Sequence, residues 1–452
     1  MKFTHAGVRA RRAPRRRRAE TPLVPARTLL AAIGAGGGAL VVLWIAQGVR
    51  PSSAADAFGA GARLAGLSAG YGLLVLVLLT ARVPAIERGL GAGRLVRWHG
   101  LAGAWVLPLL AAHAALAIAA RAADGGADAV RATLSGTAVA AGVSGALLLA
   151  LAGAVAHDSV RDRVRPFAWR TAHATAYAGV ALGFPHQPQG PDVGAHAALA
   201  LLWTLLHAQV AVVVLWYRVA VPLRQGFRHG LRVVRVRREA PDVVSVVMAG
   251  RDLHLLRAEP GQYLRWRFLD RGLWWSALPF SLSAPPGDGT LRVTVRIVGE
   301  RTARVARLRP GTRVQASGPF GAMTARRRTR RRVLLIAGGT GIAPLRALFE
   351  TLPGGPGDVT LLYRASDASG LLLRGELERI ATRRRARLHY LLDPPDRAPG
   401  DPLSPERLRA LVPVIHRHDV YVCGPPGMTE HAVRALVRAG VARHHIHTES
   451  LT

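Results

Sequence analysis

Four histidines interrupt apolar stretches of the N-terminal half. His99 and His113 are 14 residues apart, and His173 and His186 are 13 residues apart. Because a helix rises about 1.5 Å per residue, each pair would be separated by about 20 Å along its helix. A polar side chain in lipid is costly and usually has a partner, and neutral imidazole is a common ligand of iron. The spacing therefore predicts two iron-binding layers at different depths.

The apolar runs that carry these histidines are long enough to span a bilayer. Six such runs lie in the first half, at 28–47, 64–82, 99–120, 133–155, 167–186 and 196–217. The third and fifth spans run in the same direction, which pairs His99 with His173 and His113 with His186. Two facing imidazoles at one depth satisfy a six-coordinate haem iron. We therefore expect these four histidines to be the metal ligands of two haems.

Helix geometry supports the first pair better than the second. Fourteen residues at about 100° per residue return to nearly the same helix face, whereas 13 residues miss it by about 140°. The fifth span must therefore be distorted, and Pro185 could supply the distortion by removing a helical hydrogen bond. The alternative is that the four histidines make interhelical hydrogen bonds, as we expect of His196 and His207 on the sixth span.

Composition favours a membrane protein and limits its chemistry. The chain has 452 residues, of which 50% are hydrophobic, and a formal net charge of +34 from 61 Lys and Arg against 27 Asp and Glu. The arginines are spread through both halves without zinc-finger spacing, which favours membrane lipid over nucleic acid as the partner. Cys423 is the only cysteine. An intramolecular disulfide and an iron–sulfur cluster on the chain's own thiolates are therefore excluded.

Arginine-rich loops predict the orientation of the spans. The segments 82–97 and 161–170 carry four arginines each, whereas the alternate loop 187–195 has none. Basic loops stay on the cytoplasmic side of a membrane. The basic tail 1–27 lacks the apolar core and cleavage site of a signal peptide, so we expect it to be retained. The sequence thus predicts a multi-pass protein of the cell membrane with both termini in the cytoplasm.

A shift in composition near residue 230 marks the start of a soluble half. Segments within 228–325, such as "LRVVRVRRE" and "LRVTVRIV", are short, rich in β-branched residues and bounded by turn residues. They predict an antiparallel β-barrel. From 330 to 452, strand-like and helix-like segments alternate, which is typical of an α/β nucleotide-binding domain.

Two glycine-rich turns of the last segment could bind a nucleotide. "GGTGIAP", residues 338–344, lies between a buried strand and a helix, where glycines permit a tight turn and the helix N-terminus can receive a pyrophosphate. "CGPPGM", residues 423–428, has the same place at the end of another strand. Ligands of open α/β sheets lie at the carboxyl ends of strands. The two turns together indicate a nucleotide site.

These motifs carry a family resemblance. The second half resembles the ferredoxin–NADP reductase superfamily, and residues 28 to 452 resemble ferric reductases and NADPH oxidases. The resemblance is carried by "LPFSLSAPP" at 278–286, "GPFG" at 318–321, "GGTGIAP", "CGPPGM" and the histidine spacing. It implies a six-helix transmembrane haem domain at 28–220, an FAD-binding β-barrel and an NAD(P)-binding α/β domain. Such a protein passes electrons from NADPH or NADH through FAD and two b-type haems to ferric iron or dioxygen across the membrane.

The resemblance also implies roles for individual residues. It places Ser281 at the reactive edge of the flavin, surrounded by Pro279, Phe280, Leu282 and Ser283, with Gly299 and Thr302 near the FAD phosphates. It places Gly338, Gly339, Thr340, Gly341, Gly424 and Pro425 around the nicotinamide nucleotide, with Arg364 near its adenosine ribose. Cys423 would lie beside the nicotinamide, and Ser281, Cys423 and Glu449 would form the catalytic site.

Two positions depart from the family pattern. Leu278 stands where the family usually has His or Arg, so one polar contact to the flavin is expected to be missing. Glu449 is followed by Ser450 and Leu451 rather than by the aromatic residue that commonly shields the flavin. Neither change removes the apparatus for hydride transfer, because the cofactor carries that chemistry.

Two other functions fit parts of the sequence. In the first, a membrane-anchored NAD(P)H-dependent reductase without haem would reduce a flavin, a quinone or a partner protein. In the second, the helices would form a permease with a fused redox regulator, although the sequence offers no internal repeat to favour it.

Overall fold

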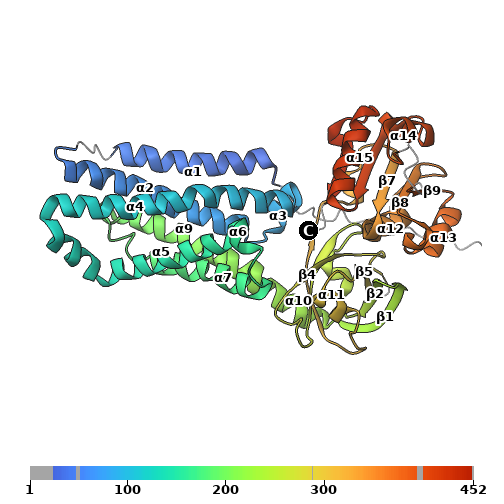
Figure 1. Ribbon diagram of the computed structural model, residues 1–452, viewed down its shortest axis with the longest axis horizontal. Helices are drawn as coiled ribbons and strands as arrows, with labels where there is room; N and C mark the ends of the chain where they lie inside the picture. Colours follow the sequence, from blue (N-terminus) through green and yellow to red (C-terminus); the bar gives the residue numbers. More distant parts are fainter. Residues whose placement is uncertain (1–23, 47–50, 288, 394–400, 450–452) are drawn as a thin grey trace, which may run out of the picture.

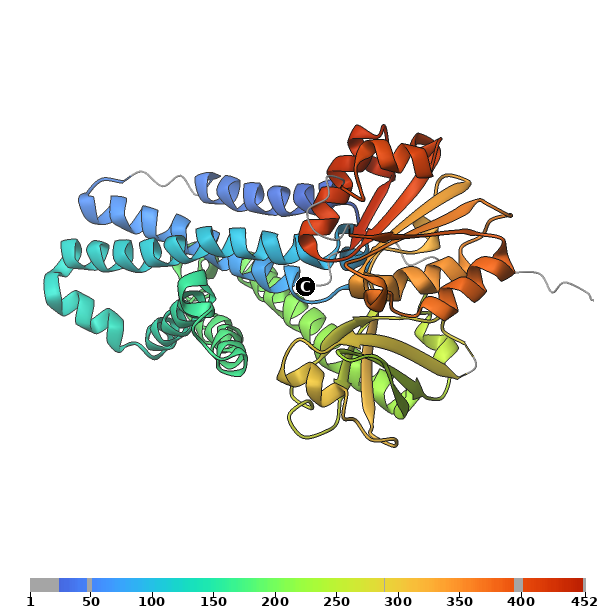
Figure 2. The ribbon, with the colours of Figure 1, turned by 45° about the vertical axis from the view of Figure 1, so that its right-hand side comes forward.

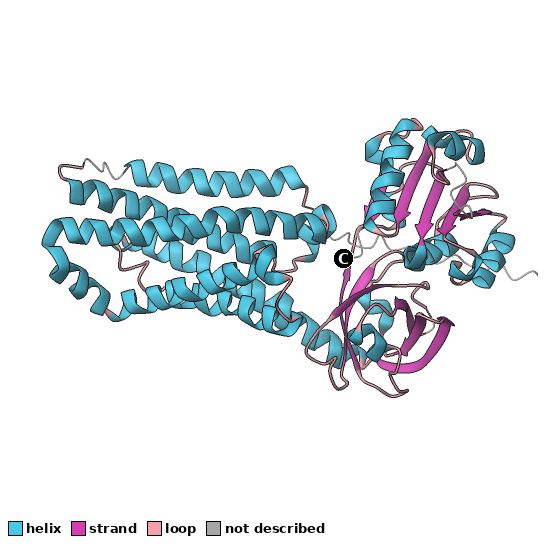
Figure 3. Ribbon diagram, viewed as in Figure 1, coloured by secondary structure: helices cyan, strands magenta, loops and turns pink. Residues whose placement is uncertain are grey.

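The computed structural model describes residues 24–46, 51–287, 289–393 and 401–449. A helical half and a half built on sheets lie side by side along the longest axis of the molecule (Figure 1). Figure 3 shows that the strands are confined to one end. Most of the predicted basic tail 1–27 falls outside the described residues, as do Ser450 and Leu451.

The helical half contains six long helices and several short ones among the described residues. The long ones are α1 (Ala26–Ala46), α2 (Ala54–Leu79), α4 (Ala92–Ser135), α5 (Thr137–Ala156), α7 (Pro166–Gly183) and α9 (Ala197–Leu215). The short ones are α3 (Pro84–Leu90), α6 (Asp158–Arg161), α8 (Pro191–Gly194), the π-helix η1 (Trp216–Ala220) and α10 (Val221–His229).

Five helices of the described chain are long and apolar enough to cross a membrane. They are Ala26–Ala46, Ala54–Leu79, Ala92–Ser135, Thr137–Ala156 and the continuous run Ala197–His229. The predicted fifth span at 167–186 corresponds to α7, which does not belong to this set. Its 18 residues include Arg170, Thr171 and His173. The predicted count of six spans is therefore not confirmed, because polar residues lower the hydropathy of α7.

The predicted third span is the middle of a much longer helix. α4 has 44 residues and contains a kink at Gly125 and Gly126, where the backbone leaves helical geometry. Gly126 has a φ of +61°, a conformation that glycine adopts without strain. Figures 1 and 2 show the chain turning back at the end of the helical half that lies away from the sheets.

The distortion predicted for the fifth span is a helix end. α7 stops at Gly183, with Phe184 as its C-cap. Pro185 and His186 lie in the turn that follows. A proline cannot continue the hydrogen-bonding pattern of a helix, so the chain changes direction there. His186 is thereby freed from the helical periodicity that would have turned it away from the face of His173.

The first soluble domain contains two antiparallel sheets. One has the order β1-β2-β5, from β1 (Arg232–Ala240), β2 (Val243–Ala249) and β5 (Thr290–Arg296). The other has the order β4-β3-β6, from β4 (Leu278–Ser281), β3 (Tyr263–Phe268) and β6 (Val314–Phe320). Single bridges, Leu282 to Val293 and Arg232 to Arg313, link the sheets. The predicted barrel is therefore not one continuous closed sheet. Helix α11 (Glu300–Val305) packs beside it.

Strand β3 has one face in the core and one face outside it. Leu264, Trp266 and Phe268 are almost completely buried in the domain core. Tyr263 and Arg265 alternate with them and share the opposite face, since successive side chains of a strand point to opposite sides. Leu278 pairs with Trp266 and belongs to the same core.

The second soluble domain has a five-stranded parallel sheet, ordered β11-β10-β7-β8-β9. Its strands are β7 (Arg332–Gly338), β8 (Val359–Ala365), β9 (Arg387–Leu392), β10 (His418–Cys423) and β11 (Ile446–Glu449). Helices α12 (Ile342–Thr351) and α13 (Arg374–Arg384) share one apolar core with the sheet, and α14 (Pro405–Leu411) and α15 (Pro426–Arg438) share another. Short 3-10 turns occur at Leu253–Leu256, Ala325–Arg327, Gly339–Gly341, Ala368–Gly370, Ile415–Arg417 and Arg443–His445.

Candidate functional site

The structure brings the four histidines together in two pairs. The ring centroids of His99 and His173 lie 6.0 Å apart with an interplanar angle of 76°. Those of His113 and His186 lie 6.1 Å apart with an interplanar angle of 22°. In both pairs one histidine comes from α4, and the other comes from α7 or from the turn after it.

Three of the four imidazoles are oriented by a neighbouring helix. His99 Nδ1 lies 3.0 Å from Leu76 O, and His113 Nδ1 lies 2.8 Å from Ala62 O, both on α2. His173 Nδ1 lies 3.0 Å from Ala152 O on α5. A carbonyl oxygen can only accept, so each Nδ1 donates the hydrogen bond, and Nε2 is the nitrogen that could bind a metal. Hydrogen bonds of this kind orient metal-bound histidines.

Glycines make room for the outer pair. A Cβ at Gly66 would lie 2.6 Å from His113 Nδ1, and a Cβ at Gly142 would lie 2.7 Å from His186 Nδ1. Both glycines line a pocket that His113, His186 and Trp203 also line. His186 Nδ1 is buried at this pocket without a hydrogen-bond partner among the described residues.

The two other histidines of the last span have ordinary structural roles. His207 Nδ1 lies 2.9 Å from Trp203 O, one turn earlier on α9. His196 is the N-terminal cap residue of α9 and is exposed. Their placement agrees with the hydrogen-bonding or interfacial role expected of them.

The predicted flavin motif ends strand β4. Ser281 is buried, and its Oγ has no hydrogen-bond partner in the part of the chain that the structure describes. Phe280 is half-buried, and its carbonyl accepts a 2.9 Å hydrogen bond from Trp266 Nε1. Pro279 is exposed and Leu282 is fully buried. Ser281 therefore offers an unused polar atom of the kind that a flavin ring would engage.

The segment expected at the FAD phosphates is held by a threonine. Thr302 Oγ1 accepts hydrogen bonds from the backbone N–H groups of Val298 and Gly299, at 2.9 and 3.2 Å. Both groups belong to the loop that leads into α11. The loop is thus ordered around Thr302 at the start of the helix.

The two glycine-rich turns lie against each other. A Cβ at Gly341 would overlap Cys423 O, and a Cβ at Gly338 would overlap Met428 Sδ. Gly339 has a φ of +53°. β7 and β10 are adjacent parallel strands, so both turns leave the same edge of the sheet. Thr340, Gly424 and Pro425 lie in these turns, so the residues that the resemblance assigns to the nucleotide are neighbours in the structure.

Cys423 and Glu449 end adjacent strands, and burial acts on both side chains. Their backbones are paired in the sheet, and Cys423 Sγ lies 3.9 Å from Glu449 O. Burial raises the pKa of the Cys423 thiol well above its usual range. Burial and, to a smaller extent, the charge of Glu87 raise the pKa of Glu449 to about 8. Both groups hold their protons at neutral pH, and Glu449 Oε2 has no hydrogen-bond partner among the described residues.

Sequence reasoning missed a polar junction between the two halves. Tyr263 on β3 donates a 2.5 Å hydrogen bond to Glu87 Oε1 on α3. Arg218 Nε donates a 3.0 Å hydrogen bond to Thr80 O at the end of α2. Burial, and then the charges of Arg265 and Arg218, lower the pKa of Arg82 to about 9. A half-buried, strongly cationic region thus lies where the helices meet the first sheet domain.

Arg364 does not present a free guanidinium. Its Nε forms a 2.8 Å ion pair with Asp393 at the end of β9. A phosphate on the adenosine ribose would have to share Arg364 with this carboxylate.

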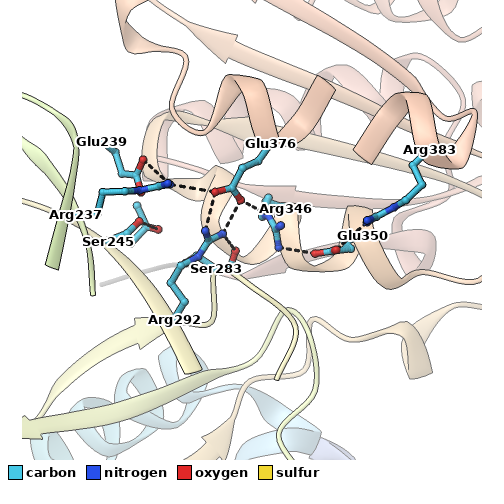
Figure 4. Close-up of polar contacts among 10 residues, drawn as sticks. Arg237, Glu239, Ser245, Ser283, Arg292, Arg346, Glu350, Glu376 and Arg383 are labelled. Atoms are coloured by element: carbon cyan, nitrogen blue, oxygen red, sulfur yellow. Dashed lines mark hydrogen bonds and ion pairs between the residues drawn. The ribbon is translucent and has the colours of Figure 1, made fainter. Parts of the chain in front are cut away.

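A second missed feature joins the two soluble domains (Figure 4). Glu376 on α13 forms ion pairs with Arg292 Nη1 at 2.8 Å and Arg237 Nη2 at 3.1 Å, both from the first sheet domain. It also pairs with Arg346 Nε on α12 at 2.9 Å. Burial would raise the pKa of Glu376, but hydrogen bonds and charges from Arg292 and Arg346 lower it to about 2. In so arginine-rich a sequence, no local signal marks these arginines.

Comparison with known families divides the chain in the same way. Residues 65–184 match the ferric reductase like transmembrane component. Residues 335–434 match the oxidoreductase NAD-binding domain. These two matches cover parts of the helical half and of the parallel-sheet domain.

Curated relatives match the soluble half. A probable dihydroorotate dehydrogenase B (NAD(+)) electron transfer subunit of Methanopyrus kandleri is 32% identical over 203 residues, which cover 44% of this chain and 70% of the relative. NADH-cytochrome b5 reductase 2 of Neurospora crassa is 33% identical over 129 residues, which cover 26% of this chain and 38% of the relative. The chain thus spans between about two fifths and two thirds of these relatives.

Solved structures also match parts of the chain. A cytochrome P450 reductase of Amycolatopsis is 27% identical, with a TM-score of 0.42 over 50% of this chain and 69% of the other. A flavohemoglobin of Malassezia yamatoensis is 18% identical, with a TM-score of 0.44 over 89% of this chain and 99% of the other.

The membrane helices and the nucleotide domain thus have separate counterparts in known proteins. One chain carries the ferric reductase-like component, and the NAD-binding domain follows it. The match to the relative from Methanopyrus kandleri covers 44% of this chain. This protein is an NAD(P)H-dependent oxidoreductase that joins a ferric reductase-like transmembrane component to a reductase half of the ferredoxin–NADP reductase type.

Proposed function

We propose that this protein accepts hydride from NAD(P)H on FAD at the cytoplasmic face and delivers electrons singly through two b-type haems to an acceptor across the membrane. The proposal depends on one observation: imidazole rings face each other in two layers, His99 with His173 and His113 with His186. When bound, the flavin supplies the change from two-electron to one-electron transfer, and the haems supply one-electron steps.

The separation of the rings supports iron between them. Two imidazoles that each bound one shared metal ion through a nitrogen about 2.0 Å away would have ring centroids roughly 6 Å apart. The centroid distances of 6.0 and 6.1 Å agree with this value. Side chains that only make hydrogen bonds between helices have no reason to repeat this distance in both layers.

The flavin end is supported by three buried groups at converging strand ends. Ser281 ends β4, Cys423 ends β10 and Glu449 ends β11. Ser281 Oγ and Glu449 Oε2 are buried polar atoms without a hydrogen-bond partner in the described chain. Unpaired buried polar atoms are costly and call for a ligand. We assign Ser281 to orienting the flavin ring, and Glu449 to holding a proton beside it.

The donor side is supported by the two glycine-rich turns. Gly338 and Gly341 allow the first turn to lie against Met428 and Cys423, and α12 begins immediately after this turn with its N–H groups directed toward it. Such a helix start stabilises a pyrophosphate. Cys423, fully buried at the end of β10, closes this site as a neutral thiol.

The proposal also covers the orientation of the protein in the membrane and the side at which the electron acceptor binds. The soluble domains and the arginine-rich loops lie in the cytoplasm, with both termini there, and the His113–His186 layer lies toward the outside of the cell membrane. Arg63 and Asp192, paired at 3.2 Å, line the pocket of this outer layer. An acceptor such as ferric iron or dioxygen would take electrons at this side.

Haem content tests the proposal directly. Pyridine-haemochrome analysis of the purified full-length protein should give about two b-type haems per chain. His113→Leu should retain one haem, whereas His207→Leu, a control on the last span, should retain both. A haem-free preparation from haem-replete cells, with flavin present, would contradict the proposal and favour the haem-free reductase.

A further inference from the structure

Arg292 joins the flavin motif to the nucleotide domain. On one side it donates to Ser283, from Nε to Oγ at 3.1 Å and from Nη2 to the carbonyl oxygen at 2.7 Å. On the other side it donates to both carboxylate oxygens of Glu376, at 2.8 and 2.9 Å. Ser283 belongs to the motif that contains Ser281, so one guanidinium contacts both domains (Figure 4).

Glu376 extends this connection to the helix of the nucleotide turn. Its Oε2 lies 2.9 Å from Arg346 Nε on α12, the helix that follows Gly341. Arg346 is buried and is also paired with Glu350 at 2.6 Å. The side chains of Arg292 and Glu376 are each only 15% exposed. A continuous set of charged contacts therefore runs from Ser283 to α12.

We propose that Arg292 and Glu376 are positioning residues that hold the nicotinamide site in register with the flavin site. The inference rests on the proposed function, because it concerns hydride transfer between these two sites. In this role each residue acts through the segment it contacts, Arg292 through Ser283 and Glu376 through Arg346 on α12.

Physical considerations favour this role over simple stabilisation. Domains of one chain move relative to each other unless their interface is fixed. A bidentate guanidinium–carboxylate pair constrains angle as well as distance. Buried ion pairs add little net stability, because desolvation opposes the attraction, but removing one partner leaves an uncompensated charge. Hydride transfer requires a close and aligned approach of the two rings, so a small shift between the domains has a large effect on rate.

Anaerobic stopped-flow reduction of the flavin in the full-length, detergent-solubilised protein tests this role. We expect Glu376→Gln to lower the limiting rate of flavin reduction by NADPH or NADH about tenfold or more. The apparent affinity for the nucleotide should change less than about twofold, because the turns that bind it are intact. The long-wavelength charge-transfer absorbance of stacked nicotinamide and flavin should weaken in parallel. A loss of folding alone would not lower the limiting rate of the remaining protein while leaving its apparent affinity for the nucleotide nearly unchanged.

The same helix offers a matched control. Glu378 lies two residues further along α13 and pairs with Arg374 at 2.8 Å, with both side chains about half exposed. Glu378→Gln should therefore leave the limiting rate unchanged. If Glu376→Gln does not accumulate as folded protein, Arg292→Lys serves instead, because it keeps the charge and loses the two-pronged contact. Its limiting rate should fall as well.

The outcomes separate this inference from the function on which it rests. A folded, flavin-containing Glu376→Gln or Arg292→Lys protein with the wild-type limiting rate and charge-transfer absorbance would overturn the positioning role. Equal slowing in Glu378→Gln would also overturn it. If neither nucleotide reduces the flavin of the wild-type protein, the proposed function itself fails and this inference fails with it.

Discussion

At the scale of single residues, burial determines which groups can hold a proton beside the proposed flavin site. Cys423 and Glu449 end neighbouring strands, and the pKa of each is raised chiefly by burial. A neutral thiol is a poor nucleophile, which suits a group that only closes the site. A carboxyl with a pKa of about 8 can release and accept a proton near neutral pH.

Glu449 should make stability fall as pH rises. Its pKa is raised from 4.5 to about 8 by folding. Between these values the folded state keeps a proton that the unfolded chain has lost, so the free energy of unfolding decreases with pH and levels off above about 8. Glu449→Gln removes this dependence.

Thermal unfolding of the detergent-solubilised, flavin-free protein checks this expectation. At each pH, the melting temperature of the wild type is subtracted from that of Glu449→Gln. This difference should rise by several degrees from pH 5 to pH 8. A difference that is constant across this range would show that the carboxyl titrates normally.

At the scale of elements, the end of α7 decides whether the outer histidines can face each other. The helix stops at Gly183, and His186 lies in the turn beyond Pro185. Had α7 continued, the spacing of 13 residues would have rotated His186 about 140° from the face of His173. The proline thus corrects a mismatch that is visible in the spacing.

Pro185→Ala should therefore disturb the outer layer selectively. Alanine favours continuation of α7 and carries His186 away from His113. We expect the haem content to fall from about two to about one per chain, with the inner layer retained. Haem quantification by the pyridine method measures this, and full retention of both haems would show that the turn forms without the proline.

Close helix packing should be as important as the ligands. A Cβ at Gly142 would lie 2.7 Å from His186 Nδ1, whereas nothing lies within 4 Å of a Cβ at Gly34 on α1. Gly142→Val should lose about one haem per chain, because the valine displaces the imidazole. Gly34→Ala should bind both haems. Identical haem content in the two variants would contradict the proposed outer site.

The sequence predicted some features well, because these features depend on residues that are close together in the chain. The histidine spacing and the glycine-rich turns depend on neighbours in the chain, and the structure has the same histidine pairs and a parallel sheet at the turns. The sequence did not decide whether the helix ends at Gly183, because a proline can either bend a helix or stop it. The two sheets are linked by isolated bridges such as Leu282 to Val293 rather than by a continuous ladder, and local spacing does not reveal such long-range pairings.

At the scale of the whole molecule, long-range charged contacts assemble the parts. Arg292 and Glu376 are 84 residues apart, and Tyr263 and Glu87 are 176 apart. With 61 Lys and Arg in the chain, the sequence cannot single out the few arginines that are buried at interfaces. Leu278 illustrates the same limit, because its burial in the core beside Trp266 is not visible in its local sequence.

The hydrogen bond between Tyr263 and Glu87 should couple the soluble and membrane halves. Tyr263→Phe removes a 2.5 Å bond between β3 and α3 and should reduce the free energy of unfolding by about 1 kcal/mol. We expect flavin reduction by NAD(P)H to proceed at the wild-type rate, and electron transfer from flavin to haem to slow severalfold, because only the second step crosses this junction. Stopped-flow absorbance resolves the two steps, and equal slowing of both would contradict this division.

The most direct measurement is the visible spectrum of the purified, full-length protein during anaerobic addition of NADPH or NADH. We predict that the flavin bleaches first and that the sharp bands of two reduced b-type haems follow, in an amount equal to the haem measured chemically. Flavin bleaching with no haem reduction, in protein that contains haem, would break the proposed chain of electron transfer at its central step.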